Sequence, residues 1–190
     1  MSVVISMLRG VNVGGHNKLK MDALRALYAS LGLRDAQTYI QSGNVVFRTG
    51  AKDLAPLSSR IQRGIERRFG FRPEVVLRTA AEMRKVLASN PMAGRRDFDA
   101  SKLLVTFLTG DPSPDGRARI LGLNPDPEEL WLRGRELYVH YPDGVGRSKL
   151  SPALIERTLK TSGTGRNWNT VVKLLEIADS LEAPRKGAER

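Results

Sequence analysis

The stretch VVISMLRGVNVGGHNKLK at residues 3–20 is the most informative about the fold. It joins a largely apolar run to a segment whose sequence does not suit a regular helix or strand. Residues 3–8 are apolar at nearly every position, which is typical of a central strand covered on both faces. Residues 10–20 contain three glycines and two asparagines, and these predict an irregular loop. A helix is expected over residues 21–31, and Gly32 is expected to end it.

The following segments complete a β-α-β-β-α-β order. Short β-rich runs at residues 38–41 and 45–47 flank the sequence Ser-Gly-Asn, which predicts a β-hairpin. Residues 53–69 carry apolar side chains four residues apart, which predicts an amphipathic helix. A strand is expected at residues 74–77. This order is that of a ferredoxin-like α+β subdomain.

The second half of the chain predicts a similar order of elements. A helix at residues 80–89 and a linker to residue 100 lead to a strand at 102–109 and a helix at 114–123. Strands at 129–133 and 136–141 and a helix at 151–159 follow. In place of a final strand, a last helix is expected from about Asn167. We therefore predict an α+β fold of two subdomains, residues 1–79 and 101–182, joined through 80–100 and followed by a disordered basic tail at 183–190.

The composition excludes several classes of function. The 190 residues include no cysteine, which excludes disulfides, thiolate zinc sites and cysteine nucleophiles. No apolar run approaches the roughly 20 residues that span a bilayer, so we expect a soluble, cytoplasmic protein with no membrane partner. Lysine and arginine total 31 against 20 acidic residues, a net charge of +11. This excess favours an acidic partner, such as a phosphorylated small molecule, a nucleic acid or an anionic surface, and the alternative is that the charge serves solubility alone.

Four separated segments occur in a recognisable order: RGVNVGG at residues 9–15, TYIQSGNVVF at 38–47, GVGRSKL at 144–150 and GRNWNTVVKLL at 165–175. Together they resemble the bacterial family known as domain of unknown function 1697. The resemblance extends over residues 3–175. It implies a two-subdomain α+β fold with a ferredoxin-like element order, and it implies no particular activity.

The glycine-rich loop is the first candidate binding site. Glycines permit a ligand to approach the backbone, amide and lysine side chains supply donors, and the start of the following helix favours an anion. The loop matches neither the Walker A motif nor the dinucleotide fingerprint GxGxxG. The alternative is that its glycines form a tight crossover that the asparagines cap. The candidate residues are Arg9, Gly10, Asn12, Gly14, Gly15, Asn17 and Lys18.

Three further groups are expected to join this loop. Ser42 and Asn44 in the hairpin turn lie near Arg9 if their strands neighbour the first strand. A basic segment before the helix at residue 151 contributes Arg147 and Lys149. We predict that these groups and the start of the last helix line one cleft between the subdomains, although each also suits an ordinary turn or cap. The start of the last helix contributes Arg166 and Asn167.

The leading hypothesis is a binding protein for a phosphate-bearing ligand or a nucleic acid. Whether the chain is an enzyme stays open: HExxH and GxSxG motifs are absent, and His16 is the one acid or base candidate near the loop. His140 is expected to be a packed or surface residue. We predict no metal and no cofactor. A protein-interaction module is a third alternative, and the oligomeric state is undetermined.

The helix at residues 53–69 also carries Arg60, Arg63 and Arg67 on one stripe. Such a stripe either follows the phosphates of a nucleic acid or forms an ordinary solvated face. Stacking of bases on an exposed sheet is disfavoured because few aromatic residues occur in the first strand and the hairpin.

Overall fold

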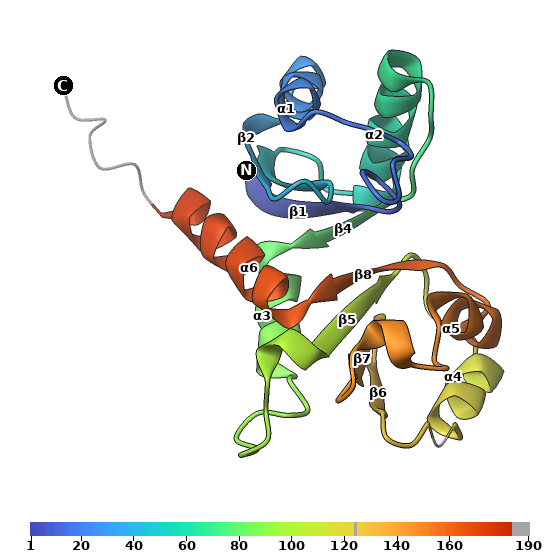
Figure 1. Cartoon of the computed structure of the whole chain (residues 1–190). Helices are drawn as coiled ribbons and strands as arrows, with labels where there is room; N and C mark the ends of the chain where they lie inside the picture. The colour runs from blue at the N-terminus through green and yellow to red at the C-terminus, as the bar shows by residue number, and fades with distance from the viewer. Residues whose placement is uncertain (124, 184–190) are drawn as a thin grey trace. The chain divides into compact units, whose positions relative to one another are not determined.

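The computed structural model describes residues 1–123 and 125–183 and contains two four-stranded antiparallel sheets with helices (Figure 1). The chain divides into two compact units. The first comprises Met1–Arg84 and the chain from Lys173, and the second comprises Lys85–Val172. The predicted α+β class with two subdomains is confirmed. The predicted disordered tail lies, apart from Ala183, outside the described residues.

The first unit has the predicted element order. Its sheet contains β1 (Ser2–Leu8), β2 (Arg34–Tyr39), β3 (Asn44–Thr49) and β4 (Val75–Thr79) in the order β2-β3-β1-β4. Helix α1 (Met21–Ser30) follows β1, and α2 (Leu54–Phe69) follows β3. The hairpin strands are longer than expected, because β2 is a largely polar edge strand whose sequence carries little strand signal.

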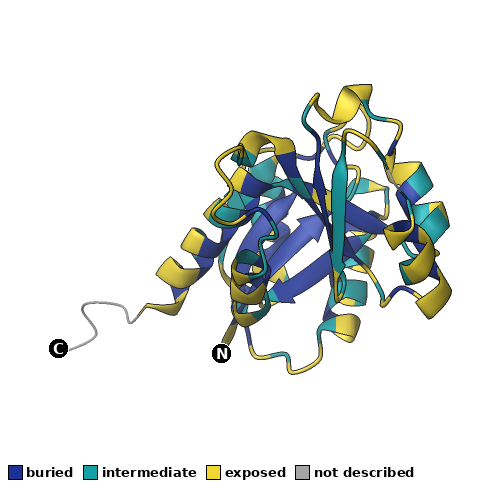
Figure 2. Cartoon of the chain, turned by 90° about the horizontal axis from the view of Figure 1, so that it is seen from below, coloured by how far each residue is buried: buried dark blue, intermediate teal, exposed yellow. Residues whose placement is uncertain are grey.

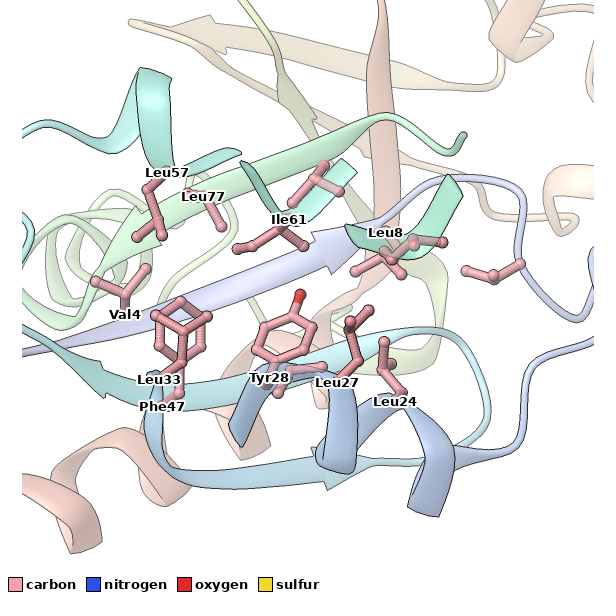
Figure 3. Close-up of a cluster of buried hydrophobic side chains, with 14 of the residues drawn as sticks. Val4, Leu8, Leu24, Leu27, Tyr28, Leu33, Phe47, Leu57, Ile61 and Leu77 are labelled. Carbon is pink, nitrogen blue, oxygen red and sulfur yellow. The ribbon is translucent and has the colours of Figure 1, made fainter. Parts of the chain in front are cut away.

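The core of the first unit lies between the sheet and the helices α1 and α2, as Figure 3 shows. Val4 and Leu8 of β1 point to this side, and between them the Ser6 hydroxyl is 2.7 Å from the Tyr28 hydroxyl. Val3, Ile5 and Met7, which alternate with them along β1, are buried as well. The first strand is therefore covered on both faces, as its apolar sequence predicted.

The second unit repeats the arrangement. Its sheet contains β5 (Leu103–Leu108), β6 (Glu129–Arg133), β7 (Glu136–His140) and β8 (Gly163–Asn167) in the order β6-β7-β5-β8, which corresponds strand for strand to the first sheet. Helices α4 (Pro114–Leu121) and α5 (Pro152–Leu159) occupy the places of α1 and α2 in the chain order. The last helices of the two repeats are α3 (Ala80–Ala88) and α6 (Trp168–Glu182).

Strand β8 corrects the prediction that a last helix replaces the final strand. Gly163–Asn167 pairs antiparallel with β5, and α6 begins only at Trp168. A Cβ atom on Gly163 would lie 2.8 Å from the Phe107 carbonyl oxygen, so this strand depends on a residue without a side chain. Glycine lowers strand propensity, which is why the pattern of residues 162–167 indicated a helix start instead.

The burial of residues agrees with two sheets that are covered by helices and loops. In Figure 2 the strands of the sheets are mostly buried, whereas helices and loops present exposed residues outward. No helix within the described part of the chain is long and apolar enough to cross a membrane.

Candidate functional site

The loop after β1 is fixed at its first residue by an ion pair. The Arg9 Nη1 atom donates to Glu74 Oε2 at 2.9 Å, and the Arg9 backbone N–H donates to the Glu74 carbonyl. Arg9 is therefore placed beside a carboxylate of its own unit. Because this carboxylate offsets its charge, Arg9 is a weaker candidate for binding an anion than its sequence context predicted.

Asn12 ties the loop to the hairpin turn. Its Nδ2 atom donates to the carbonyl oxygens of Leu19 at 3.0 Å and Gln41 at 2.8 Å, while its Oδ1 atom accepts from the Leu19 N–H at 2.7 Å. The Asn17 side chain also bonds to the loop backbone: its Nδ2 atom donates to the Gly10 carbonyl at 3.0 Å. Both amide side chains thus hold the backbone. This agrees with the alternative interpretation of the loop, in which the asparagines cap a tight crossover.

The far end of the loop is exposed and bends through left-handed conformations. Gly14 and Gly15 have φ angles of 59° and 79°, and Asn17 has φ 49°. A short antiparallel bridge joins Val13 to His16. The His16 side chain is exposed and makes no hydrogen bond with the described residues.

The hairpin turn packs directly on this loop. Gly43 has φ 72°, and a Cβ atom there would lie 2.6 Å from Val11 Cγ2 and 2.8 Å from Leu8 Cβ. Ser42 Oγ accepts from Asn44 Nδ2 at 2.7 Å, so these side chains also serve the turn. The structure therefore brings the turn and the glycine loop together, but it uses both predicted turn residues locally.

A hollow of about 740 Å³ lies between the loop, the turn and the start of α1. Three of the predicted residues line it, namely Asn12, Gly15 and Lys18. The sequence reasoning missed its other lining residues, which come from the approach to α1, from its first turn and from the hairpin: Leu19, Lys20, Met21, Asp22 and Gln41. The Asp22 carboxylate is ion-paired with Arg25. His16 and Arg9 do not line this hollow.

Helix α1 starts at this hollow without a side-chain cap. Lys20 occupies its N-cap position with extended backbone, φ −73° and ψ 132°, and makes no capping hydrogen bond. Each of the other five α-helices in the described part of the chain starts with an N–H donating to a side-chain oxygen at 2.9–3.3 Å. The capping residues are Asp53, Thr79, Ser113, Ser151 and Asn167.

A larger hollow of about 1040 Å³ on the same unit contains none of the predicted residues. Three arginines line it, but Arg25 is paired with Asp22 and Arg48 is paired with Asp35. Carboxylates thus offset most of its charge, and we regard the smaller hollow as the better candidate for an anion.

The predicted residues of the second unit fall into two groups. Arg147 and Lys149 are exposed in the segment before α5 and make no side-chain contact with a described partner by hydrogen bond or ion pair. Arg166 is buried in β8, where it donates to Thr164 Oγ1 at 2.7 Å and to the Gly165 carbonyl at 2.8 Å. Burial lowers the pKa of Arg166 to about 10. Asn167 is the last residue of β8 and caps α6, so the expected helix start is off by one residue there, whereas Arg166 lies within the strand and does not open the helix.

A buried arginine in the first unit also escaped the sequence reasoning. Arg78 pairs with Ile5 across β4 and β1, at the register position that Arg166 occupies opposite Val105. Both are buried, and both donate to the carbonyl of the residue before them. The signal that would have found this correspondence is the repeated element order. The predicted convergence of Arg9 with Arg147, Lys149 and Arg166 involves both units and stays a prediction.

The remaining chemical candidates are sparse. His140 is buried, its Nδ1 atom lies 3.8 Å from Glu129 Oε1, and neither ring nitrogen has a hydrogen-bond partner within the described residues. Trp168 is buried too, so it offers no stacking surface. Within residues 1–123 and 125–183, no three His, Asp or Glu side chains form a group that could hold a metal ion.

The fold and the loop define an α+β protein whose two units share one order of strands and helices. The family described as "Protein of unknown function (DUF1697)" matches residues 1–138, and the chain belongs to it. A conserved bacterial protein from Streptococcus pneumoniae has a similar solved structure, with a TM-score of 0.75 and 23% sequence identity over 93% of this chain and 98% of that chain. This likeness shows the shared fold. No curated protein matches the chain.

Proposed function

We propose that this protein binds a phosphate-bearing small molecule in the hollow at the start of α1. The observation that carries the proposal is the uncapped helix: α1 starts at the hollow with Lys20 at its N-cap, while the other five α-helices have side-chain caps. A missing cap costs a helix about 1 kcal/mol. An anionic ligand that accepts from the first N–H groups would offset this cost.

The charges around the hollow support an anion. Lys18 and Lys20 are exposed and line it, and neither side chain makes a hydrogen bond or ion pair with the described residues. The one carboxylate in the lining, that of Asp22, is paired with Arg25 outside it. The positive end of the α1 dipole adds to the attraction for a phosphate.

Size and rigidity support a small ligand. A volume of about 740 Å³ lies within the range of roughly 300–1,000 Å³ that is typical of small-molecule sites. The two ends of the loop are held by the side chains of Asn12 and Asn17, so the donors keep their positions without a ligand. Such preorganisation reduces the entropy lost on binding.

The same geometry favours binding over catalysis. His16, the predicted acid or base, is not among the residues that line the hollow. Lys18 and Lys20 are suited to bind a negatively charged group. The one carboxylate among the described lining residues, that of Asp22, is paired with Arg25. We therefore place the enzyme hypothesis built on His16 behind the binding hypothesis.

Titration of ¹⁵N-labelled protein with pyrophosphate and with ADP tests the proposal. We expect amide shifts at Gly15 and at residues 18–23, the backbone groups around the hollow. The double variant Lys18→Ala/Lys20→Ala should weaken binding by about tenfold or more, since hydrogen bonds to charged groups contribute about 1.5–3 kcal/mol each. The matched control Lys52→Ala/Lys85→Ala removes two exposed lysines elsewhere and should leave the affinity unchanged.

Two results would overturn the proposal. One is the absence of saturable shifts around the hollow with either probe. The other is an equal loss of affinity in both double variants, which would indicate an effect of general charge.

A further inference from the structure

The exposed face of α2 carries cations that the fold leaves without partners. The side chains of Arg60, Arg63 and Arg67 are exposed and make no ion pair or hydrogen bond with the described residues. Arg9, Arg25, Arg48, Arg72, Arg84 and Arg95 lie within ion-pair distance of carboxylates. Other exposed arginines of the described chain, such as Arg96, Arg119 and Arg157, have no ion-pair partner either, so the spacing of the three residues along one helix distinguishes them. Arg60, Arg63 and Arg67 are called the arginine stripe below.

Packing fixes the direction in which the stripe points. Leu57, Ile61 and Ile65 of the same helix are buried in the core of the first unit. Gly64 lets α2 approach α1 closely, since a Cβ atom there would lie 3.3 Å from Leu27 Cδ1. With 100° between successive residues, the stripe occupies an arc of roughly 60° on the side that faces solvent.

The charges of the stripe repel one another. Arg60 and Arg63 are three residues apart and Arg63 and Arg67 are four apart, the spacings at which like charges destabilise a helix. Glu66 is the only carboxylate within the sequence of α2, and it is paired with Arg72 at 3.6 Å. A polyanion that bridges the three guanidinium groups would relieve this repulsion.

The geometry points to a nucleic-acid duplex, contacted through its backbone, and we propose this as a second binding surface. Seven residues of helix place Arg60 and Arg67 roughly 10 Å apart, a length over which duplex DNA carries about six phosphate charges. Stacking of single-stranded bases is disfavoured, because the exposed large apolar residues in the described chain are not aromatic. They are Met1, Val13, Ile40, Leu121 and Val145.

Contact with phosphates alone predicts binding that ignores sequence and depends on salt. Each neutralised phosphate contributes close to one unit to the slope of log affinity against log salt. Three contacts therefore account for roughly a 40-fold loss of affinity between 50 and 200 mM salt.

Fluorescence anisotropy with a labelled mixed-sequence 20-base-pair DNA duplex and an RNA duplex tests this surface. The variant Arg60→Gln/Arg63→Gln/Arg67→Gln should lower the salt slope by about three units on both duplexes. The control Arg96→Gln/Arg119→Gln/Arg157→Gln removes the same charge from exposed arginines outside α2 and should change the slope much less. A triple Arg→Lys variant of the stripe should keep the slope, because charge rather than bidentate geometry supplies it.

Several outcomes would overturn the proposal. Equal slopes for the stripe and control variants would show that net charge alone attracts the duplex. Absence of duplex binding at 50 mM salt, or binding to anionic phosphatidylserine vesicles without duplex binding, would also reject it. The inference is independent of the phosphate hollow, so Lys18→Ala/Lys20→Ala should leave the duplex slope unchanged.

Discussion

At the scale of single residues, the glycine loop owes its shape to side chains that the sequence marked as ligand donors. The amide groups of Asn12 and Asn17 donate hydrogen bonds to backbone carbonyls of the loop, and Asn12 also donates to the hairpin turn. Residue types suited to binding are also suited to closing a tight loop, because both tasks require short polar side chains. What remains for a ligand is the backbone of Gly15 and the two lysines.

Gly43 is the residue whose replacement tests this packing most directly. Gly43→Ala should destabilise the protein by about 2–4 kcal/mol, because the new methyl group meets Val11 and Leu8 and the left-handed backbone disfavours a side chain. Urea denaturation followed by circular dichroism measures the loss. Gly50 has open space around it and no positive φ, so Gly50→Ala should change stability by less than about 1 kcal/mol. Similar losses in both variants would contradict the close contact.

At the scale of elements, α1 starts without a side-chain cap at the hollow where we propose that an anion binds. Lys20 has the extended backbone of an N-cap residue but no side-chain oxygen to accept from the first turn. Ser or Asp at this position would supply that oxygen, as Asp53 does for α2. A lysine here gives up helix stability and adds a cation at the mouth of the hollow.

Lys20→Ser should therefore raise stability and lower affinity together. We expect a gain of about 0.5–2 kcal/mol in the free energy of unfolding, from the new cap, and weaker binding of pyrophosphate. Thermal denaturation and the NMR titration measure the two effects. Lys20→Ala, which removes the charge without adding a cap, serves as the control and should lower affinity without the gain in stability. Unchanged affinity in both variants would separate Lys20 from the site.

At the scale of the whole molecule, both units contain buried tyrosine side chains whose ionisation is disfavoured. Burial raises the pKa values of Tyr28 and Tyr138 well above their ordinary value of 10, and it raises that of Tyr141 to about 12. Tyr28 lies in the first unit, and the other two lie in the second. In the unfolded chain, all three hydroxyl groups titrate near pH 10.

The sign of the pH dependence follows from this difference. Above pH 10 the unfolded chain binds fewer protons than the folded chain, so stability should fall as pH rises from 10 toward 12. Tyr28→Phe removes one of these groups and should make the fall less steep, although it also leaves the Ser6 hydroxyl without this partner. Urea denaturation at pH 8, 10 and 11 measures the slope. An identical slope in the variant would contradict the shift assigned to Tyr28.

The sequence predicted the elements whose signals are local. The apolar run at residues 3–8 predicted a strand buried on both faces, and the i, i+4 spacing from Leu57 to Ile65 predicted α2. Strand β8 escaped prediction because its glycines and polar residues become a strand only through pairing with β5. Edge strand β2 was placed too late for the same reason, since its pairing with β3 rather than its composition defines it.

By itself, therefore, the sequence determined the α+β class, the family, the order of most elements and the loop at which a site is expected. Only the tertiary structure decided which of the basic and amide side chains are available to a ligand. Arg9 lies against Glu74, Asn12 holds the hairpin, and Arg166 is buried in a strand, whereas Lys18 and Lys20 face a hollow. The physical reason is that a polar side chain serves either a backbone group or a ligand, and the choice depends on neighbours distant in sequence.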